Sequence, residues 1–150
     1  MSIEYKSYSY GTPEYQKARI LRYCILRLGD GISDECVEEV YGDSSQEQSH
    51  ILLGAFDGEL LVGTVNLAPH GEDSLTLCSL AVHDARRGSG IGAELVRFAH
   101  ETARVRGYRH IRLMARGNVV AFYEKLGYAP TGEVSTHPDI TFVEMTTTLA

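Results

Sequence analysis

The sequence predicts an α/β fold: a mixed, mostly antiparallel central sheet of about seven strands flanked by four helices. Two strand-like runs, residues 50–56 and 60–67, are joined at Asp57-Gly58, a dipeptide typical of tight hairpins. A third apolar run, residues 74–82, follows after another turn. It leads into a glycine-rich turn and an amphipathic run, residues 91–106, which together have the order of a crossover to a parallel strand.

The stretch before the hairpin is expected to hold one strand, residues 3–8, and two helices. Thr12 can cap the first helix, and Pro13 suits its first position because the fixed φ of proline is already helical. The buried face of this helix is predicted from apolar residues at helical spacing: Ala18, Leu21, Ile25 and Leu28. A shorter helix is expected over residues 33–41, and the polar run 42–49 is expected to be a loop.

The second half of the chain is expected to complete the sheet. The buried stripe of the helix over residues 91–106 is predicted to be Ile91, Leu95, Phe98, Ala99 and Thr102. A short strand, residues 110–115, is followed by a short helix that Asn118 can cap. Residues 128–134 and 140–149 resemble a closing pair of strands. The whole order, β-α-α-β-β-β-α-β-α-β-β, fits a sheet with an antiparallel start and a parallel crossover.

Length, charge and cysteine content limit the class of protein. At 150 residues, the chain is expected to be one domain, residues 1–150. The net charge of −6 makes nucleic acid a poor partner. No apolar run approaches the roughly 18 residues of a membrane span, and the first residues lack a signal pattern. Three scattered cysteines indicate a reducing compartment, so a cytoplasmic location is expected. The histidines lack metal-ligand spacing, so no metal is expected.

The glycine-rich turn is the clearest sign of a binding site. It reads Arg86-Arg87-Gly88-Ser89-Gly90-Ile91-Gly92. Backbone N–H groups of such a turn and of the helix that follows point the same way, and the helix dipole adds positive charge. Glycines let the backbone approach a phosphate closely, and the arginines add fork-shaped donors. The turn therefore predicts a ligand that carries a pyrophosphate.

Two motifs in this order resemble those of the GCN5-related N-acetyltransferase (GNAT) superfamily. The first is the run Arg87 to Gly92 after the fourth predicted strand. The second, Ala121-Phe122-Tyr123-Glu124-Lys125-Leu126-Gly127-Tyr128, looks like the FYxKLGF segment of that family. The resemblance covers the whole chain in element order and residues 77–128 in specific motifs. It implies the family's acyl-CoA N-acyltransferase fold, in which the fourth strand and the next parallel strand splay apart.

The resemblance also implies how acetyl-CoA would bind. Its pantetheine arm would lie between the splayed strands and bond the backbone of residues 80–82, while backbone N–H groups of residues 88–93 would hold the pyrophosphate. Many relatives have an asparagine seven residues before the motif tyrosine; Arg116 stands there in this chain, and Asn118 lies five before. The residues implied to bind the cofactor are Leu80, Ala81, Val82, Arg87, Gly88, Ser89, Gly90, Ile91, Gly92, Ala93 and Asn118.

The implied reaction is the transfer of an acetyl group from acetyl-CoA to a primary amine by direct attack. Tyr123 matches the family tyrosine that protonates the leaving thiolate. The acceptor would be a small-molecule or peptide amine, and a homodimer is compatible with the resemblance. Some relatives have a histidine in the final strand where this chain has Phe142, so a role of that histidine does not carry over.

Several alternatives stay open. The same fold could hold CoA as a non-catalytic sensor. Gly88, Gly90 and Ala93 also satisfy the dinucleotide pattern G-x-G-x-x-A, but the next strand leads into Arg116 rather than the required acidic residue. His83 could act as a base or be an ordinary loop residue. Three acidic residues could face an amine or form an exposed helix face: Glu35, Glu38 and Glu39.

Overall fold

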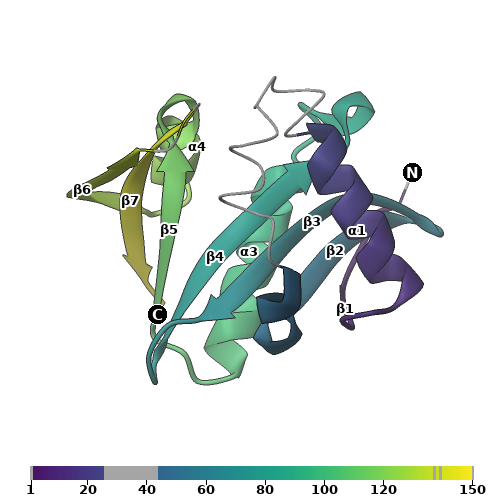
Figure 1. The fold of residues 1–150 in the computed structure, drawn as a ribbon, viewed down its shortest axis with the longest axis horizontal. Helices are drawn as coiled ribbons and strands as arrows, with labels where there is room; N and C mark the ends of the chain where they lie inside the picture. The colour runs from purple at the N-terminus through teal and green to yellow at the C-terminus, as the bar shows by residue number, and fades with distance from the viewer. Residues whose placement is uncertain (1, 26–43, 137, 139, 150) are drawn as a thin grey trace.

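The computed structural model describes residues 2–25, 44–136, 138 and 140–149. One sheet of seven strands runs through them in the order β1-β2-β3-β4-β5-β7-β6 (Figure 1). Every neighbouring pair is antiparallel except β4 and β5. The mixed, mostly antiparallel sheet predicted from the sequence is confirmed. The strands are β1 (Glu4–Tyr8), β2 (Ile51–Asp57), β3 (Leu60–Pro69), β4 (Ser74–Val82), β5 (His110–Arg116), β6 (Ala129–Thr136) and β7 (Thr141–Thr148).

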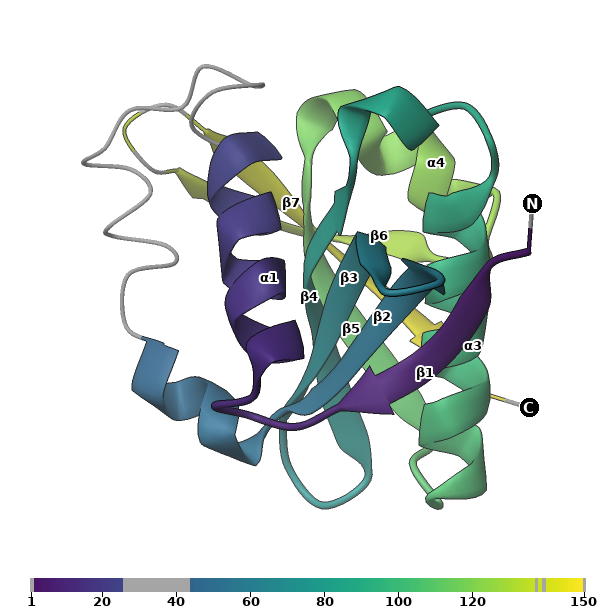
Figure 2. The same ribbon diagram turned by 90° about the vertical axis from the view of Figure 1, so that its right-hand side faces the viewer.

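Helices cover both faces of the sheet. The helix α1 (Pro13–Tyr23) lies on one face, and α3 (Ile91–Val105) lies on the other (Figure 2). The short helix α4 (Val120–Glu124) follows β5. The helix predicted over residues 33–41 lies outside the described residues. No helix within the described ranges is long and apolar enough to cross a membrane.

The start of α1 follows the sequence prediction. The hydroxyl of Thr12 accepts a hydrogen bond from the Tyr15 N–H at 3.3 Å, and Pro13 occupies the first turn. Three of the predicted stripe residues are buried in a cluster with residues from β2, β3 and β4: Ala18, Leu21 and Ile25. The fourth, Leu28, lies outside the described residues. The cap and the apolar stripe therefore act together, since the cap fixes where the helix begins and the stripe fixes which face meets the sheet.

The buried face of α3 is rotated relative to the prediction. Three predicted residues are buried: Ile91, Leu95 and Ala99. Phe98 and Thr102 are only half-buried, whereas Val96 and Ala103 are fully buried. The prediction was wrong at these positions because an apolar stripe gives the approximate side of a helix, and the final rotation depends on how the helix packs on β2, β3 and β4.

The polar run predicted to be a loop contains a 3-10 helix, Ser44–Ser49. It buries the carboxylate of Glu47, which accepts hydrogen bonds from Tyr15 and from both terminal nitrogens of Arg22. These partners lie 25 and 32 residues away in the chain. Local polarity therefore predicted an exposed loop, whereas distant partners in α1 bury one of its charges.

Asn118 does not cap α4, which corrects the prediction. It lies within a 3-10 turn, Gly117–Val119, and the residue at the cap position is Val119, which makes no side-chain capping bond. The 3-10 turn already carries the chain from β5 into α4, so the helix begins one residue later than an asparagine cap at position 118 would place it.

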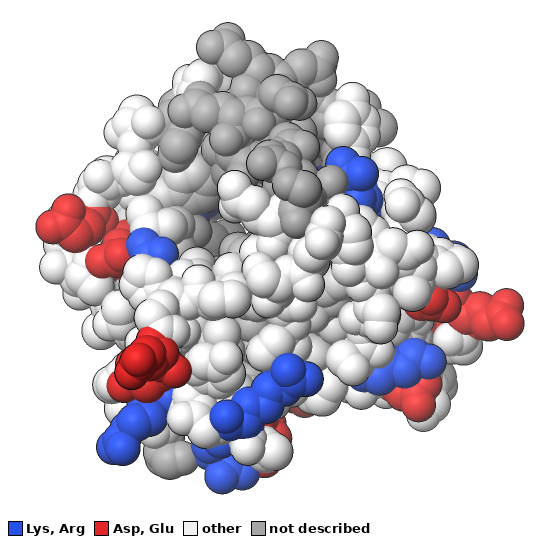
Figure 3. All heavy atoms as spheres, turned by 60° about the horizontal axis from the view of Figure 1, so that its bottom comes forward, with Lys and Arg blue, Asp and Glu red and all other residues white. Residues whose placement is uncertain are grey.

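Charged side chains are mixed by sign on one face of the molecule. On the face shown in Figure 3, acidic and basic side chains lie in small groups next to each other. On α3, two arginines pair with glutamates one turn before them, Arg97 with Glu94 and Arg104 with Glu101. The net negative charge is therefore not gathered into one field on this face.

Candidate active site

The parallel strands β4 and β5 pair over only part of their length. Their register runs from Ser74 opposite His110 to Leu77 opposite Leu113 and then stops. Beyond that point β4 still pairs with β3 and β5 still pairs with β7. The two strands therefore diverge, as Figure 1 shows, and the splayed pair implied by the sequence resemblance is confirmed.

A bulge lies where the strands begin to diverge. Ser79 has a φ of 59°, and among the described residues every other positive φ belongs to a glycine. The register between β3 and β4 shifts between Thr64 and Asn66. A bulge bends its strand and takes backbone groups out of the ladder. The sequence carried no signal for it, because a serine within an apolar strand does not indicate a left-handed residue.

The divergence opens a cleft of about 570 Å³, a size typical of small-molecule sites. It brings together eleven of the twelve predicted site residues: Leu80, Ala81, Val82, Arg87, Gly88, Gly90, Ile91, Gly92, Ala93, Asn118 and Tyr123. The twelfth, Ser89, is not among the lining residues, and its hydroxyl donates to the Arg86 carbonyl. Both motifs of the sequence therefore contribute to one cleft.

The glycine turn places uncapped N–H groups at one end of the cleft. Gly88 and Gly90 have φ values of 81° and 87°, a conformation that favours glycine. Gly90 is the N-cap of α3, and no side chain caps the helix. The first N–H groups of this fifteen-residue helix, from Ile91 onward, are thus available to an anion.

Two arginines flank this turn in different ways. Arg86 lies 2.9 Å from the Asp57 carboxylate and ties the turn to the β2–β3 hairpin. Arg87 lies 3.2 Å from Asp84, in an exposed pair one turn apart. The pair of Arg87 is screened by solvent and weak, so an anionic ligand can compete for this guanidinium.

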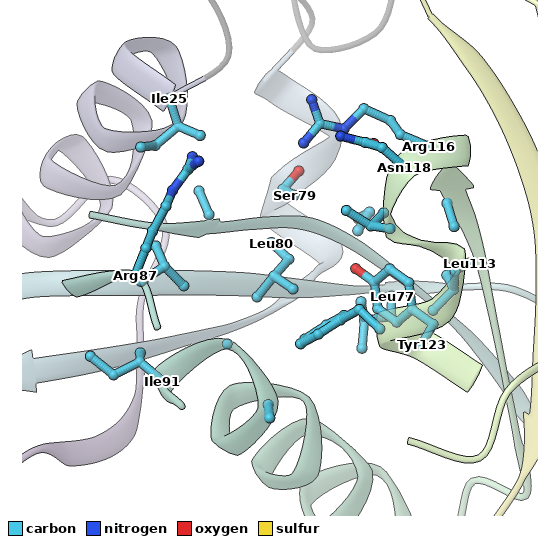
Figure 4. Close-up of a pocket in the computed structure, with 18 of the residues that line it drawn as sticks. Ile25, Leu77, Ser79, Leu80, Arg87, Ile91, Leu113, Arg116, Asn118 and Tyr123 are labelled. Atoms are coloured by element: carbon cyan, nitrogen blue, oxygen red, sulfur yellow. The ribbon is translucent and has the colours of Figure 1, made fainter. Parts of the chain in front are cut away.

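Tyr123 lies at the other end, on α4. Its ring meets those of Phe122 and Tyr128 nearly edge-on, with centroids 5.0 and 5.7 Å apart. Figure 4 shows its hydroxyl directed toward the part of the cleft where Ser79 and Leu80 lie. The side chain is 7% exposed, so packing fixes the ring while its oxygen faces the cleft.

The third part of the cleft lies toward α1, where Arg22, Ile25 and Cys78 contribute to its wall. Arg22 binds both oxygens of Glu47, at 2.7 and 2.9 Å. Burial alone would raise the pKa of Glu47, but hydrogen bonds from Arg22 and Tyr15 outweigh it, and the pKa is lowered. Sequence reasoning missed this buried pair, since neither residue belongs to a motif.

The cysteine on this wall is a poor nucleophile. Burial raises the pKa of the Cys78 thiol to about 11, so the reactive thiolate is scarce at neutral pH. The side chain of Cys78 is half-buried.

Other candidates from the sequence are not among the described residues that line the cleft. His83 is exposed, and its Nδ1 accepts a hydrogen bond from the Ala85 N–H, so it stabilises the short turn after β4. The acidic residues Glu35, Glu38 and Glu39 lie outside the described residues. Within the described ranges, no group of three His, Cys, Asp or Glu residues is arranged to hold a metal ion.

A sequence model of the Acetyltransferase (GNAT) family matches residues 15–128, which include both halves of the cleft. The chain belongs to the GNAT acetyltransferase family. The family predicted from the two motifs is therefore confirmed.

The similarity of this GNAT chain to one curated relative covers only part of either sequence. The chain is 33% identical over 90 residues to a mycothiol acetyltransferase of Mycolicibacterium smegmatis, a match that covers 60% of the chain and 28% of that relative. The chain thus matches less than a third of that protein's length.

Solved structures agree with the fold. A structure described as a putative N-acetyltransferase from Lactobacillus plantarum superposes with a TM-score of 0.85 at 23% identity, covering 100% of both chains. A GNAT family acetyltransferase from Elizabethkingia anophelis, solved with acetyl-CoA bound, gives a TM-score of 0.71 at 19% identity and covers 98% of both chains. At this identity the likeness establishes the GNAT fold.

Proposed function

We propose that this GNAT protein transfers an acetyl group from acetyl-CoA to a primary amine by direct attack. One observation carries the proposal: the bulged, splayed end of β4 joins an uncapped helix N-terminus at one side to the Tyr123 hydroxyl at the other. A pyrophosphate, an extended amide-bearing arm and a thioester, in that order, match these three parts of the cleft.

Acetyl-CoA binds through backbone groups. Its pyrophosphate meets the N–H groups of residues 88–93, with Arg87 adding charge. Its pantetheine amides pair with β4 at residues 80–82, as an added strand would, because β5 no longer occupies that side. At this end of the site, the shape of the cleft and its backbone N–H donors, rather than a catalytic side chain, select the cofactor.

The proposed reaction forms a bond between the amine nitrogen and the acetyl carbonyl carbon and releases the thiol of CoA. The neutral amine attacks the thioester carbonyl, and a backbone N–H of β4 near the bulge stabilises the oxyanion. Collapse breaks the C–S bond, and Tyr123 donates its proton to the departing thiolate. Among the described residues, no carboxylate or histidine lines the cleft, so we assign the proton lost by nitrogen to water.

The acceptor enters from the α1 side of the cleft. Ile25, Met114 and Phe142 are apolar residues of the cleft wall, and the charged residues that line the described cleft are all arginines. Arginines repel a polycation. A small-molecule or peptide amine on a partly apolar body therefore fits this wall better than a polyamine does.

An amine screen tests the proposal. Thiol release from acetyl-CoA should rise with at least one primary amine and should depend on Tyr123. Tight CoA binding without turnover for any amine would favour the alternative, a CoA sensor. Calorimetric titration with CoA and with NAD distinguishes an acetyltransferase or a CoA sensor from a dinucleotide-binding enzyme. The homodimer stays a prediction, which sedimentation velocity tests.

A further inference from the structure

A histidine on α3 reaches the aromatic cluster behind Tyr123. The His100 Nε2 atom lies 2.7 Å from the Tyr128 hydroxyl, and the two rings lie 5.4 Å apart. Tyr128 is 3% exposed, and its ring meets Tyr123 nearly edge-on. Neither His100 nor Tyr128 is among the residues that line the cleft. These contacts therefore hold Tyr123 from the side away from the reacting atoms.

The backbone strengthens the link between the two tyrosines. The Tyr128 N–H donates to the Tyr123 carbonyl at 3.1 Å, where α4 ends. Gly127, with a φ of 98°, supplies the reversal that this closing bond needs. Because ring and backbone of Tyr128 both contact Tyr123, a shift of Tyr128 tilts the ring that carries the proposed acid.

We propose that His100 is a positioning residue for acetyl transfer: its hydrogen bond to Tyr128 sets the direction of the Tyr123 hydroxyl, and protonation of His100 reverses that hydrogen bond and removes the acceptor of the Tyr128 O–H. The proposal rests on the proposed function, because the role of Tyr123 as the acid belongs to it. His100 touches neither substrate and acts only through the Tyr128 ring.

The proton states at neutral pH suit this bond. Burial lowers the pKa of His100 from its ordinary value near 6.5, so the imidazole is neutral. Burial, followed by the charge of Tyr123, raises the pKa of Tyr128, so its phenol keeps its proton. A neutral imidazole with its proton on Nδ1 offers Nε2 as the acceptor for that O–H. Once His100 is protonated, both nitrogens are donors, and a buried O–H loses its acceptor.

Protons reach His100 from the outer surface. It lines a shallow second pocket of about 340 Å³ on α3, together with Leu126 and the end of β7. The charged groups that face it there, Arg97, Glu101 and Arg104, all come from α3, while Leu126 and residues 147–149 carry no charged side chain. Arg97 and Arg104 each pair with a glutamate, so these charges largely offset each other. His100 can therefore titrate without a proton crossing the cleft.

Single-turnover rates as a function of pH test the proposal. Tyr128→Phe removes only the hydroxyl, and it should lower the rate at neutral pH about tenfold with unchanged CoA affinity, because misdirecting a reacting group costs rate rather than binding. His100→Leu should act alike. His100→Gln provides a hydrogen-bond acceptor that does not titrate. This variant should keep most of the rate at neutral pH, and its rate should not show the decrease at acid pH that protonation of His100 causes.

Matched controls use the same chemical changes elsewhere. Tyr5→Phe removes a hydroxyl from a ring that packs on Phe98 of α3, and His110→Gln removes an imidazole at the start of β5. Both should keep the wild-type rate and pH profile. The acceptor amine also titrates, so every variant is compared with the same amine. A Tyr128→Phe enzyme with the wild-type rate and profile overturns the proposal.

A readout without turnover separates this proposal from the proposed function. The ring carbons of Tyr123, assigned with Tyr123→Phe, should shift in NMR spectra of the ligand-free protein as His100 titrates, and should stay fixed in His100→Gln. If Tyr123 follows His100 but no amine is acetylated, the proposed function fails and the link stands. If amines are acetylated but Tyr123 does not respond, the link is rejected.

Discussion

At the scale of single residues, the proposed chemistry depends on where one phenol points. Tyr123 is packed between Phe122 and Tyr128, and its hydroxyl faces the diverging strands (Figure 4). A phenol has an ordinary pKa near 10 and a thiol one near 8.5, so a protonated phenol is present at neutral pH when the thiolate leaves.

Tyr123→Phe keeps the ring and removes the proton donor. We expect the single-turnover rate to fall about 10²-fold, the lower range for lost acid catalysis, while CoA affinity changes little. Tyr10→Phe, a change at an exposed tyrosine, is the control. Equal single-turnover rates for wild type and Tyr123→Phe would reduce Tyr123 to a packing residue.

Gly90→Asp places a carboxylate at the proposed pyrophosphate site. CoA affinity measured by calorimetry should fall at least about tenfold, equivalent to about 1.4 kcal/mol. Gly71→Asp is a matched control, because Gly71 has a similar φ of 79° in the turn between β3 and β4, and neither glycine has an atom within 4 Å of an added Cβ. Normal CoA binding in a folded Gly90→Asp protein would contradict the pyrophosphate assignment.

At the scale of elements, α1 is joined to the sheet by an apolar cluster and by one buried ion pair. Arg22 and Glu47 have side chains that are each 10% exposed, and Tyr15 adds a third hydrogen bond of 2.6 Å. The pair connects α1 to the 3-10 helix before β2, and Arg22 also lines the cleft. Removing one partner leaves the other charge buried, which costs more than the pair contributes when intact.

Glu47→Gln should lower the free energy of unfolding by about 3 kcal/mol, as measured in urea, because the Arg22 charge loses its partner. Glu101→Gln breaks an exposed pair with Arg104 and should leave stability nearly unchanged. Similar losses in both variants would show that burial of the Arg22–Glu47 pair does not matter.

The same pair makes stability depend on pH. The pKa of Glu47 is lower in the folded protein than in the unfolded chain, so its contribution is present above the unfolded value near 4.3 and is lost as pH falls through the folded value. Thermal unfolding between about pH 3 and pH 6 should therefore show a steeper acid loss in the wild type than in Glu47→Gln. Parallel curves would exclude this contribution.

At the scale of the whole molecule, one core joins both sides of the cleft. The main buried cluster takes residues from β2, β3, β4, β5, β7, α3 and α4, so the diverging strands share a common base. Beyond Leu77 and Leu113, the backbone groups of β4 and β5 that face each other have no strand partner on that side. In an isolated splayed pair, water would hydrogen-bond these groups. The surrounding core keeps the strands apart and leaves those groups to a ligand.

Because one core spans the sheet, residues 1–150 should unfold as a single domain. Urea denaturation followed by far-ultraviolet circular dichroism and by tyrosine fluorescence should give coincident, single transitions. Saturating CoA should shift both midpoints upward together. Two separated transitions would instead indicate that the β6–β7 side unfolds independently.

The sequence by itself determined the local features. Thr12 and Pro13 fixed the start of α1, and Asp57-Gly58 fixed the hairpin. Such features depend on backbone preferences and contacts within a few residues, which a sequence pattern records directly. The two motifs also identified the family, and with it the mixed sheet.

Only the tertiary structure decided the features that join distant residues. The left-handed Ser79, the rotation of α3 toward Val96 and Ala103, and the burial of Glu47 all depend on partners from other elements. The bond between His100 and Tyr128 spans 28 residues. The free energy of these arrangements comes from packing and desolvation of groups that meet only after the sheet has formed, so no local pattern could carry them.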